Sequence, residues 1–165
     1  MNTETLEALK FRTKVKNEDL ENVRNILSSR EIFHDDELEI ANELVEETLE
    51  EGSESPYLFV FAEIDGKTAG YSCFGRIPCT KYSWDLYWIG VHHDYKRLGL
   101  GKILVHETEK IIKENGGKYM YIETSSRERY SPTHSFYDSC DCKIAARIKD
   151  FYDEGDDKLL YKKCL

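Results

Sequence analysis

The sequence lacks a basic excess, a long apolar run and any internal repeat or low-complexity linker. Its 23 Lys and Arg residues stand against 32 Asp and Glu residues, which gives a net charge of −9. Such a surface repels phosphate backbones, so nucleic acid is excluded as a general partner. No apolar run approaches the ~20 residues that span a bilayer. A phosphate-bearing ligand therefore requires a local cluster of basic residues.

Metal-ligand spacing is also absent from the cysteines. The five cysteines form no CxxC pair, and their odd number argues against a closed disulfide framework and for a reducing compartment. They lie at positions 73, 79, 140, 142 and 164. The segment Met1–Glu4 is polar and acidic, unlike a signal or transit peptide. We therefore expect a cytoplasmic protein with no bound metal and no membrane association.

What is present is the composition of a globular domain. The 165 residues are 40% hydrophobic and include eleven Tyr, which is enough for a core of its own. Since no linker interrupts the chain, we expect one domain over residues 1–165.

Periodicity and turn residues predict alternating strands and helices. Asn17 is the expected N-cap of the first helix, and Asp65-Gly66 predicts a tight hairpin. The expected strands are 9–15, 56–64, 68–77, 83–91, 119–122, 143–151 and 158–164; the expected helices are 18–28, 35–51, 99–115 and one that begins near Pro132. This order predicts an α/β fold, in the α+β sense of a mixed, largely antiparallel sheet with helices on both faces.

The stretch from Ile89 to Lys102 is the most informative. A strand runs through a short loop with two glycines into an amphipathic helix. The N–H groups at a helix start are unpaired and the helix dipole adds positive charge there, which favours a bound anion. Lys96, Arg97 and Lys102 supply the local basic cluster. Glycine at 99 and 101 leaves that backbone open to a ligand.

The same stretch is compatible with two further interpretations. A plain strand-to-helix turn with solvated basic residues would have the same glycines. The GxxxxGK[ST] pattern is missing, and the GxGxxG pattern fails because Leu104 replaces its third glycine. A nucleotide-binding module that uses the same helix start is therefore an alternative, weakened by the absence of a ribose-reading acid at the known spacing.

Taken with the element order, the stretch Lys96–Gly101 resembles the Q/R-x-x-G-x-G/A signature of the GNAT superfamily of acyl-CoA N-acyltransferases. Three later pieces are similar to that family: the strand end Ile122–Thr124, the helix with Phe136-Tyr137-Asp138, and the closing hairpin. There are departures as well. Lys96 replaces Arg or Gln, Asp141 replaces a glycine that must be left-handed, and Tyr130 replaces a common Asn.

The resemblance implies an N-acetyltransferase that uses acetyl-CoA, with no metal. Ile89 and Val91 would bond the pantetheine arm, and the Val91 N–H would lie near the acyl carbonyl. The pyrophosphate would be held by the residues of the helix start. These are Arg97, Leu98, Gly99, Leu100, Gly101 and Lys102.

The resemblance also implies that Tyr137 donates a proton to the CoA thiolate. A helix aromatic beside Phe136 is otherwise an ordinary core residue. Glu123 is a candidate base, although a carboxylate at a strand end is more often solvated or ion-paired. His92, His93 and His134 are further candidates for the base, since histidine is the residue most often used for proton transfer.

The acceptor expected from the charge is a primary amine, such as a cationic small molecule or a lysine side chain. The resemblance implies that the acidic helix 35–51 and the turn 153–157 surround the acceptor site. A run of charged residues, however, usually forms an ordinary solvent-exposed face. A non-catalytic acyl-CoA sensor on the same fold is the main alternative. Exposed strand edges leave a homodimer open.

Overall fold

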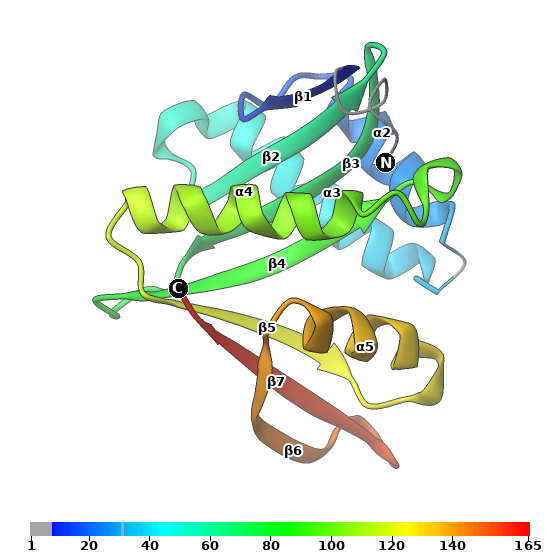
Figure 1. Ribbon diagram of the computed structural model, residues 1–165, viewed down its shortest axis with the longest axis vertical. Helices are drawn as coiled ribbons and strands as arrows, with labels where there is room; N and C mark the ends of the chain where they lie inside the picture. Colours follow the sequence, from blue (N-terminus) through cyan, green and yellow to red (C-terminus); the bar gives the residue numbers. More distant parts are fainter. Residues whose placement is uncertain (1–7, 31) are drawn as a thin grey trace. The chain divides into compact units, whose positions relative to one another are not determined.

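The computed structural model describes residues 8–30 and 32–165, and its contacts divide the chain into two compact units (Figure 1). The first unit contains Met1–Gly75 and Trp88–Thr108, and the second contains Arg76–Tyr87 and Glu109–Leu165. The single domain expected over residues 1–165 stays a prediction. Each unit is therefore described by itself.

The described elements follow the predicted order, and the mixed sheet is confirmed. Its strand order is β1-β2-β3-β4-β5-β7-β6. The strands are β1 (Leu9–Arg12), β2 (Tyr57–Ile64), β3 (Lys67–Arg76), β4 (Ser83–Val91), β5 (Tyr119–Ser125), β6 (Lys143–Asp153) and β7 (Asp156–Cys164). The α-helices are α2 (Asp19–Ser28), α3 (Asp35–Glu51), α4 (Leu100–Glu114) and α5 (Ser131–Ser139), with short 3-10 turns η1 (Gly52–Glu54), η2 (His93–Tyr95) and η3 (Glu128–Tyr130).

The first strand and the first helix both differ from the predicted bounds. The strand ends at Arg12 rather than at residue 15, and the helix begins at Asp19 with Glu18, not Asn17, at the N-cap position. The Asp19 carboxylate explains both differences, because it accepts bonds from the Arg12 guanidinium and from the backbone N–H of Lys16. This fully buried carboxylate pulls residues 13–18 into a turn.

In the first unit, β1, β2 and β3 pair antiparallel. Asp65 and Gly66 join β2 to β3 with φ values of 51° and 76°, as a two-residue hairpin with two left-handed residues requires. Alternate side chains of β2 and β3 join α2 and α3 in one buried cluster. It contains Val23, Ile26, Leu27, Leu38, Ala41, Val45, Phe59, Phe61, Tyr71 and Cys73.

The other face of β3 is covered by the first turns of α4 (Figure 1). A Cβ built on Gly70 would lie 3.1 Å from Leu104 Cδ1, and Ser72 Oγ lies 2.7 Å from Thr108 Oγ1. Since Gly70 and Ser72 alternate with Tyr71 and Cys73, helices cover both faces of this part of the sheet.

In the second unit, β4 and β5 run parallel, and their pairing reaches from Ser83–Tyr119 to Asp85–Tyr121. Strand β5 continues to Ser125 in antiparallel pairing with β7, and β6 pairs with the other side of β7. Strands β4, β5 and β7 each have a buried face, which carries residues such as Trp84, Met120, Ile122 and Tyr161. All eleven residues of β6 are exposed.

Candidate active site

The loop that follows β4 is fixed by bonds to its neighbours in the first unit. The backbone N–H of His92 donates to the Ala69 carbonyl at 2.9 Å, and that of His93 donates to Ser29 Oγ at 3.0 Å. His93 Nδ1 lies 3.0 Å from Lys96 Nζ. These contacts hold the chain in place between the end of β4 and the start of α4.

The turn into α4 contains two left-handed residues. Arg97 has a φ of 63° and Gly99 has a φ of 77°. The glycine was expected, but Arg97 is an uncommon residue for this conformation, which costs it about 1 kcal/mol or more. Helix α4 then begins at Leu100, which is buried, and its first bonds run from Lys102 and Ile103 N–H to the Gly99 carbonyl.

This helix start fits an anionic ligand. The N–H groups of the first helical turn have no intrahelical acceptor. A Cβ built on Gly99 would meet no atom within 4 Å, so the backbone is open on that side. Lys96, Arg97 and Lys102 are exposed. The predicted pyrophosphate residues Arg97–Lys102 thus form one continuous segment with the backbone and charge that a diphosphate requires.

Two glycines that the sequence reasoning did not select position the end of β4. A Cβ on Gly70 would lie 2.8 Å from the Gly90 carbonyl oxygen, and one on Gly90 would lie 2.8 Å from Ile26 Cγ2. Both distances are too short for a real side chain. The two glycines therefore let β3, β4 and α2 approach closely, which places Ile89 and Val91, both half-buried, at the strand end that leads into the loop.

Tyr137 is buried in the second unit. Its ring lies 5.4 Å from Tyr161 and 5.5 Å from Phe136, and burial raises the pKa of its phenol well above the ordinary value. The helix that carries it ends as expected: Asp141 is left-handed, with a φ of 61°, and Cys142 N–H donates to the Tyr137 carbonyl at 3.1 Å. The side chain is thus a core residue that keeps its proton at neutral pH.

His134 is less suited to act as a base than the sequence suggested. Its Nε2 lies 2.8 Å from the Ser125 carbonyl oxygen. Since a carbonyl oxygen only accepts, Nε2 carries the proton and donates it. His134 also stacks on Tyr161 at 6.5 Å, so it ties α5 to the end of β5.

Glu123 is ion-paired with Lys158 of β7. Asp85 on β4 belongs to the same group, although the sequence reasoning missed it. Its register partner is Tyr121, and Glu123 follows on the same face of the sheet. Burial, and then the charge of Glu123, raise the pKa of Asp85 to about 6, whereas Lys158 opposes the shift. The available signal was an acid that alternates with Trp84 and Leu86 in an apolar strand.

The acidic turn at residues 153–157 is largely neutralised within the chain. Asp156 and Asp157 are buried and pair with Arg127 and Arg147. Arg127 also bonds Asp153 at 2.8 Å. Most of these carboxylates therefore stabilise the β6–β7 hairpin rather than present free charge. Seven acids of α3 remain exposed: Asp35, Asp36, Glu39, Glu43, Glu46, Glu50 and Glu51.

In residues 8–30 and 32–165, no group of three or more His, Cys, Asp or Glu side chains is placed to hold a metal ion. No helix in those ranges is long and apolar enough to cross a membrane. All five cysteines lie in the described part, and none of them forms a disulfide.

Together, the first unit carries a helix start suited to a diphosphate, with Ile89, Val91 and residues 97–102. The second unit carries Tyr137 and Glu123, the two predicted catalytic residues, together with Asp85. A mixed sheet with helices and this helix start is the class of protein that the sequence predicted. The profile of the Acetyltransferase (GNAT) family matches residues 20–141. The chain belongs to the GNAT acetyltransferase family.

Individual relatives agree with this membership. An N-alpha-acetyltransferase of Sulfurisphaera tokodaii is 28% identical over 112 residues, 62% of this chain and 66% of the relative, which is just under two thirds of its length. The crystal structure of a candidate GNAT-family acetyltransferase from Desulfovibrio desulfuricans has a TM-score of 0.93 and 38% identity, covering 95% of this chain and 99% of that one.

A third similarity concerns the fold alone. The PaiA N-acetyltransferase of Thermoplasma acidophilum, solved in complex with coenzyme A, has a TM-score of 0.72 at 20% identity. The superposition covers 95% of this chain and 99% of that one.

Proposed function

We propose that this protein transfers an acetyl group from acetyl-CoA to a primary amine. The observation that carries the proposal is the open helix start at Gly99–Lys102 in a chain of the GNAT family. The solved relative that binds coenzyme A supports the same donor. A non-catalytic acyl-CoA sensor is not favoured, because a sensor has no need for the group of Asp85, Glu123 and Lys158.

Acetyl-CoA would be held by residues of the first unit. The backbone of Arg97–Lys102 and the exposed cations Lys96, Arg97 and Lys102 suit its diphosphate. Backbone groups of Ile89 and Val91 would bond the pantetheine arm, and the Val91 N–H would polarise the acyl carbonyl. Acetyl-CoA supplies an activated thioester, and the remaining chemistry is two proton transfers.

The first proton transfer removes a proton from the attacking ammonium. Asp85 is suited to this role because its pKa of about 6 leaves it mostly deprotonated at pH 7 and still basic enough to accept a proton. Glu123, the base candidate from the sequence, is held by Lys158. We assign Glu123 and Lys158 to setting the charge around Asp85, and Asp85 to accepting the proton directly or through water.

The second proton transfer protonates the thiolate that leaves. Tyr137 has a proton to give at neutral pH, since burial raises its pKa. A raised pKa makes the phenol a weak acid, but a phenol matched to a basic thiolate in dry surroundings still donates productively. This role agrees with the family resemblance and coexists with the packing of Tyr137 on Tyr161.

Two acceptor classes are consistent with the observations. The seven exposed acids of α3 favour a cationic amine, such as a polyamine, an amino sugar or a lysine side chain. The similarity to an N-alpha-acetyltransferase favours the α-amine of a peptide instead. We place the cationic amine first, because α3 belongs to this chain and its charge can be tested.

The deciding experiment is a panel of amines assayed for release of the CoA thiol. It contains a polyamine, an aminoglycoside, a lysine peptide with a blocked N-terminus, and a peptide with a free N-terminus and no lysine. Turnover with any of them supports the transferase. Tight binding of acetyl-CoA in calorimetry without turnover across the panel would identify a sensor, and binding of ATP in place of acetyl-CoA would identify a nucleotide module.

A further inference from the structure

The end of helix α2 bonds the loop that follows β4, although 64 residues separate the two bonded positions in the chain. Ser29 directly follows the last residue of α2 and is half-buried. Its hydroxyl donates to the Ile26 carbonyl at 2.7 Å and accepts the backbone N–H of His93 at 3.0 Å. A hydroxyl has a single proton. Since the helix takes that proton, the oxygen is left as an acceptor for the loop.

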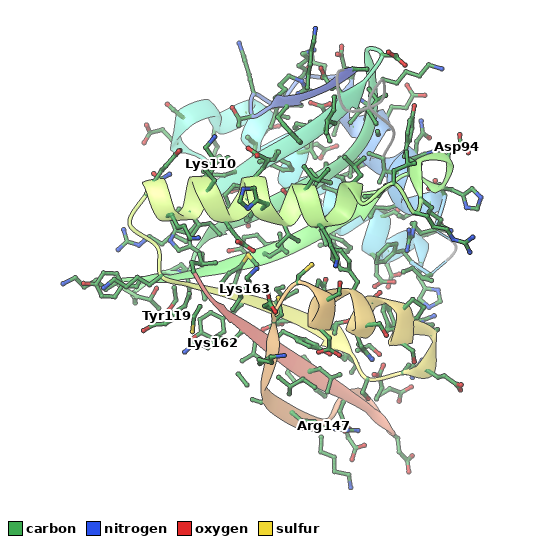
Figure 2. All side chains as sticks on the ribbon, viewed as in Figure 1. Asp94, Lys110, Tyr119, Arg147, Lys162 and Lys163 are labelled. Atoms are coloured by element: carbon green, nitrogen blue, oxygen red, sulfur yellow. The ribbon has the colours of Figure 1, made fainter. Side chains whose placement is uncertain are left out.

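His93 in turn determines where Lys96 lies. His93 is the first residue of the short turn η2, whose middle residue, Asp94, is exposed (Figure 2). The Lys96 N–H donates to the His93 carbonyl at 3.2 Å, and Lys96 Nζ lies 3.0 Å from His93 Nδ1. Because an ammonium group only donates, Nδ1 is the acceptor and Nε2 carries the ring proton. Both the backbone and the side chain of Lys96 are therefore held by His93.

Helix α2 is a firm support for this loop. At its start, the fully buried Asp19 accepts two bonds from the Arg12 guanidinium. Near its end, Ile26 is buried, and a Cβ built on Gly90 would lie only 2.8 Å from Ile26 Cγ2. Close packing of this kind leaves the helix little room to shift. A loop that is bonded to Ser29 thus takes its position from the core of the first unit.

We propose that Ser29 is a positioning residue for Lys96 and, through it, for the diphosphate of acetyl-CoA. This role rests on the proposed function, in which Lys96 is one of the cations that suit the diphosphate. An exposed lysine side chain has many rotamers, and ordering it on binding lowers the affinity for the ligand. The contacts from Ser29 to His93 and from His93 to Lys96 order that side chain before the ligand binds.

The first test replaces two adjacent serines and measures the affinity for acetyl-CoA by calorimetry. Ser29→Ala leaves the His93 N–H without its acceptor and should raise the Kd about three- to tenfold, the range expected for one hydrogen bond. Ser28→Ala is the matched control and should leave the Kd unchanged, because the Ser28 hydroxyl donates to the Asn25 carbonyl at 3.3 Å, within α2 itself.

Two further readouts separate positioning of the diphosphate from a general structural effect. S-acetylpantetheine, which lacks the diphosphate, should bind wild type and both serine variants equally. In steady-state kinetics, Ser29→Ala should raise the KM for acetyl-CoA and leave kcat unchanged. Equal acetyl-CoA affinities of the two serine variants, or an equal loss of affinity for S-acetylpantetheine, would overturn the assignment.

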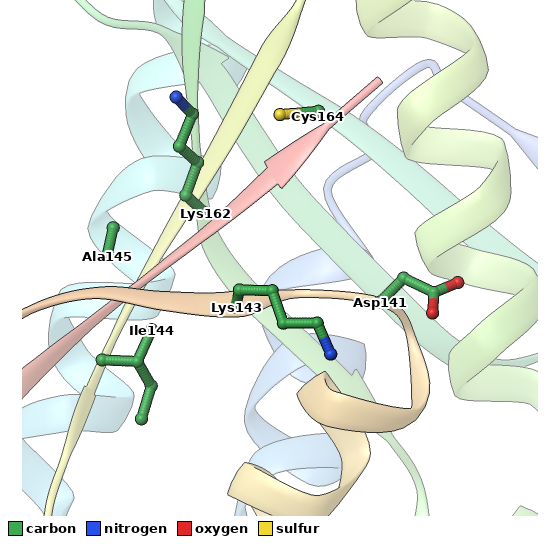
Figure 3. A pocket seen from close by; sticks show the side chains of 6 residues that line it. All are labelled: Asp141, Lys143, Ile144, Ala145, Lys162 and Cys164. Carbon is green, nitrogen blue, oxygen red and sulfur yellow. The ribbon is translucent and has the colours of Figure 1, made fainter.

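A double-mutant cycle tests whether Ser29 acts through Lys96. Lys96→Ala should weaken acetyl-CoA about tenfold or more, since a charge-assisted bond is lost, and adding Ser29→Ala should then change the Kd less than about twofold. Lys143→Ala, at an exposed lysine that lines an open hollow at the start of β6 (Figure 3), is the charge control and should leave the Kd unchanged. Effects of Ser29→Ala and Lys96→Ala that simply multiply would refute the proposal.

The wild type distinguishes a failure of this role from a failure of the proposed function. If the wild type binds no acetyl-CoA, the proposed function is refuted. If it binds and the two serine variants agree, only the role of Ser29 is refuted. Hydrogen exchange of the His93 amide tests the contact without any ligand: the amide should exchange about tenfold faster in Ser29→Ala than in Ser28→Ala. Equal exchange rates would overturn the proposal at its first step.

Discussion

Replacing Asp85 by Asn should separate the requirements of catalysis from those of stability. The pKa of Asp85 rises from 3.8 to about 6 on folding. The folded protein therefore holds this proton more tightly than the unfolded chain, and the ionised carboxylate destabilises the fold. The full difference, about 2.2 pKa units, corresponds to about 3 kcal/mol. Because Asp85 is only half-buried, solvent screening reduces this to about 1 to 2 kcal/mol.

The pH dependence follows from the sign of that shift. Below about pH 3, Asp85 is protonated in both states, and the aspartate and asparagine proteins should have similar free energies of unfolding. Between about pH 4 and pH 6, the unfolded wild type loses the proton first, so the wild type loses stability relative to Asp85→Asn. Above about pH 6.5 the variant should be the more stable by the full amount.

The assay is urea unfolding at pH 5 and pH 8, combined with steady-state kinetics. Asp85→Asn should be more stable at pH 8 yet slower by about 10²- to 10⁴-fold in kcat, as expected for a lost base. The wild-type kcat should rise with pH through about 6, the pKa of Asp85. Asp138→Asn, at an exposed aspartate, should change unfolding by less than about 0.5 kcal/mol. A variant that is destabilised, or that keeps kcat within about threefold of wild type, would refute the base assignment.

Three further predictions concern Tyr137, Gly101 and Gly70. Tyr137→Phe should lower kcat by about 10²-fold or more while leaving the affinity for acetyl-CoA unchanged; a drop below about threefold in stopped-flow assays would make Tyr137 a core residue alone. Gly101→Val should weaken acetyl-CoA in calorimetry, because a branched Cβ then stands on the helix start, and equal affinity in a folded variant would move the diphosphate elsewhere. Gly70→Ala should cost about 1 to 3 kcal/mol in urea unfolding, since its Cβ would lie 2.8 Å from the Gly90 carbonyl, and an unchanged midpoint would contradict that close approach.

Local sequence signals predicted most of the fold. The Asp65-Gly66 hairpin, the glycine loop before α4 and the left-handed Asp141 depend on residues adjacent in the chain, and all three were found as expected. The bounds of β1 and α2 were wrong because they depend on Asp19, whose partner Arg12 lies seven residues away in the preceding strand.

The candidate site was only partly predictable for the same reason. Residues 97–102 are adjacent in the chain, so the sequence alone places them together at the start of α4; their role in holding the diphosphate stays a prediction. Asp85 and Glu123 belong to strands brought together by a crossover, and Lys158 comes from a third strand. Similarly, the sequence of the acidic turn at residues 153–157 suggests unpaired negative charge, whereas the structure pairs it with Arg127 and Arg147. The role of a charged residue therefore depends on partners that are distant in the chain.

The hydroxyl pair between Ser72 and Thr108 has a consequence for the other end of α4. Thr108 Oγ1 donates its single proton to the Leu104 carbonyl at 2.8 Å, so Ser72 must donate to Thr108. This directed bond favours one orientation of α4 about its own axis, because both hydroxyls are fully buried and keep their partners only there. Thr108 lies eight residues, or about 12 Å, along the helix from Leu100. A Thr108→Val protein would leave the Ser72 hydroxyl without its acceptor. The orientation of the start of α4 would then be less well fixed, although Thr108 itself lies far from that start.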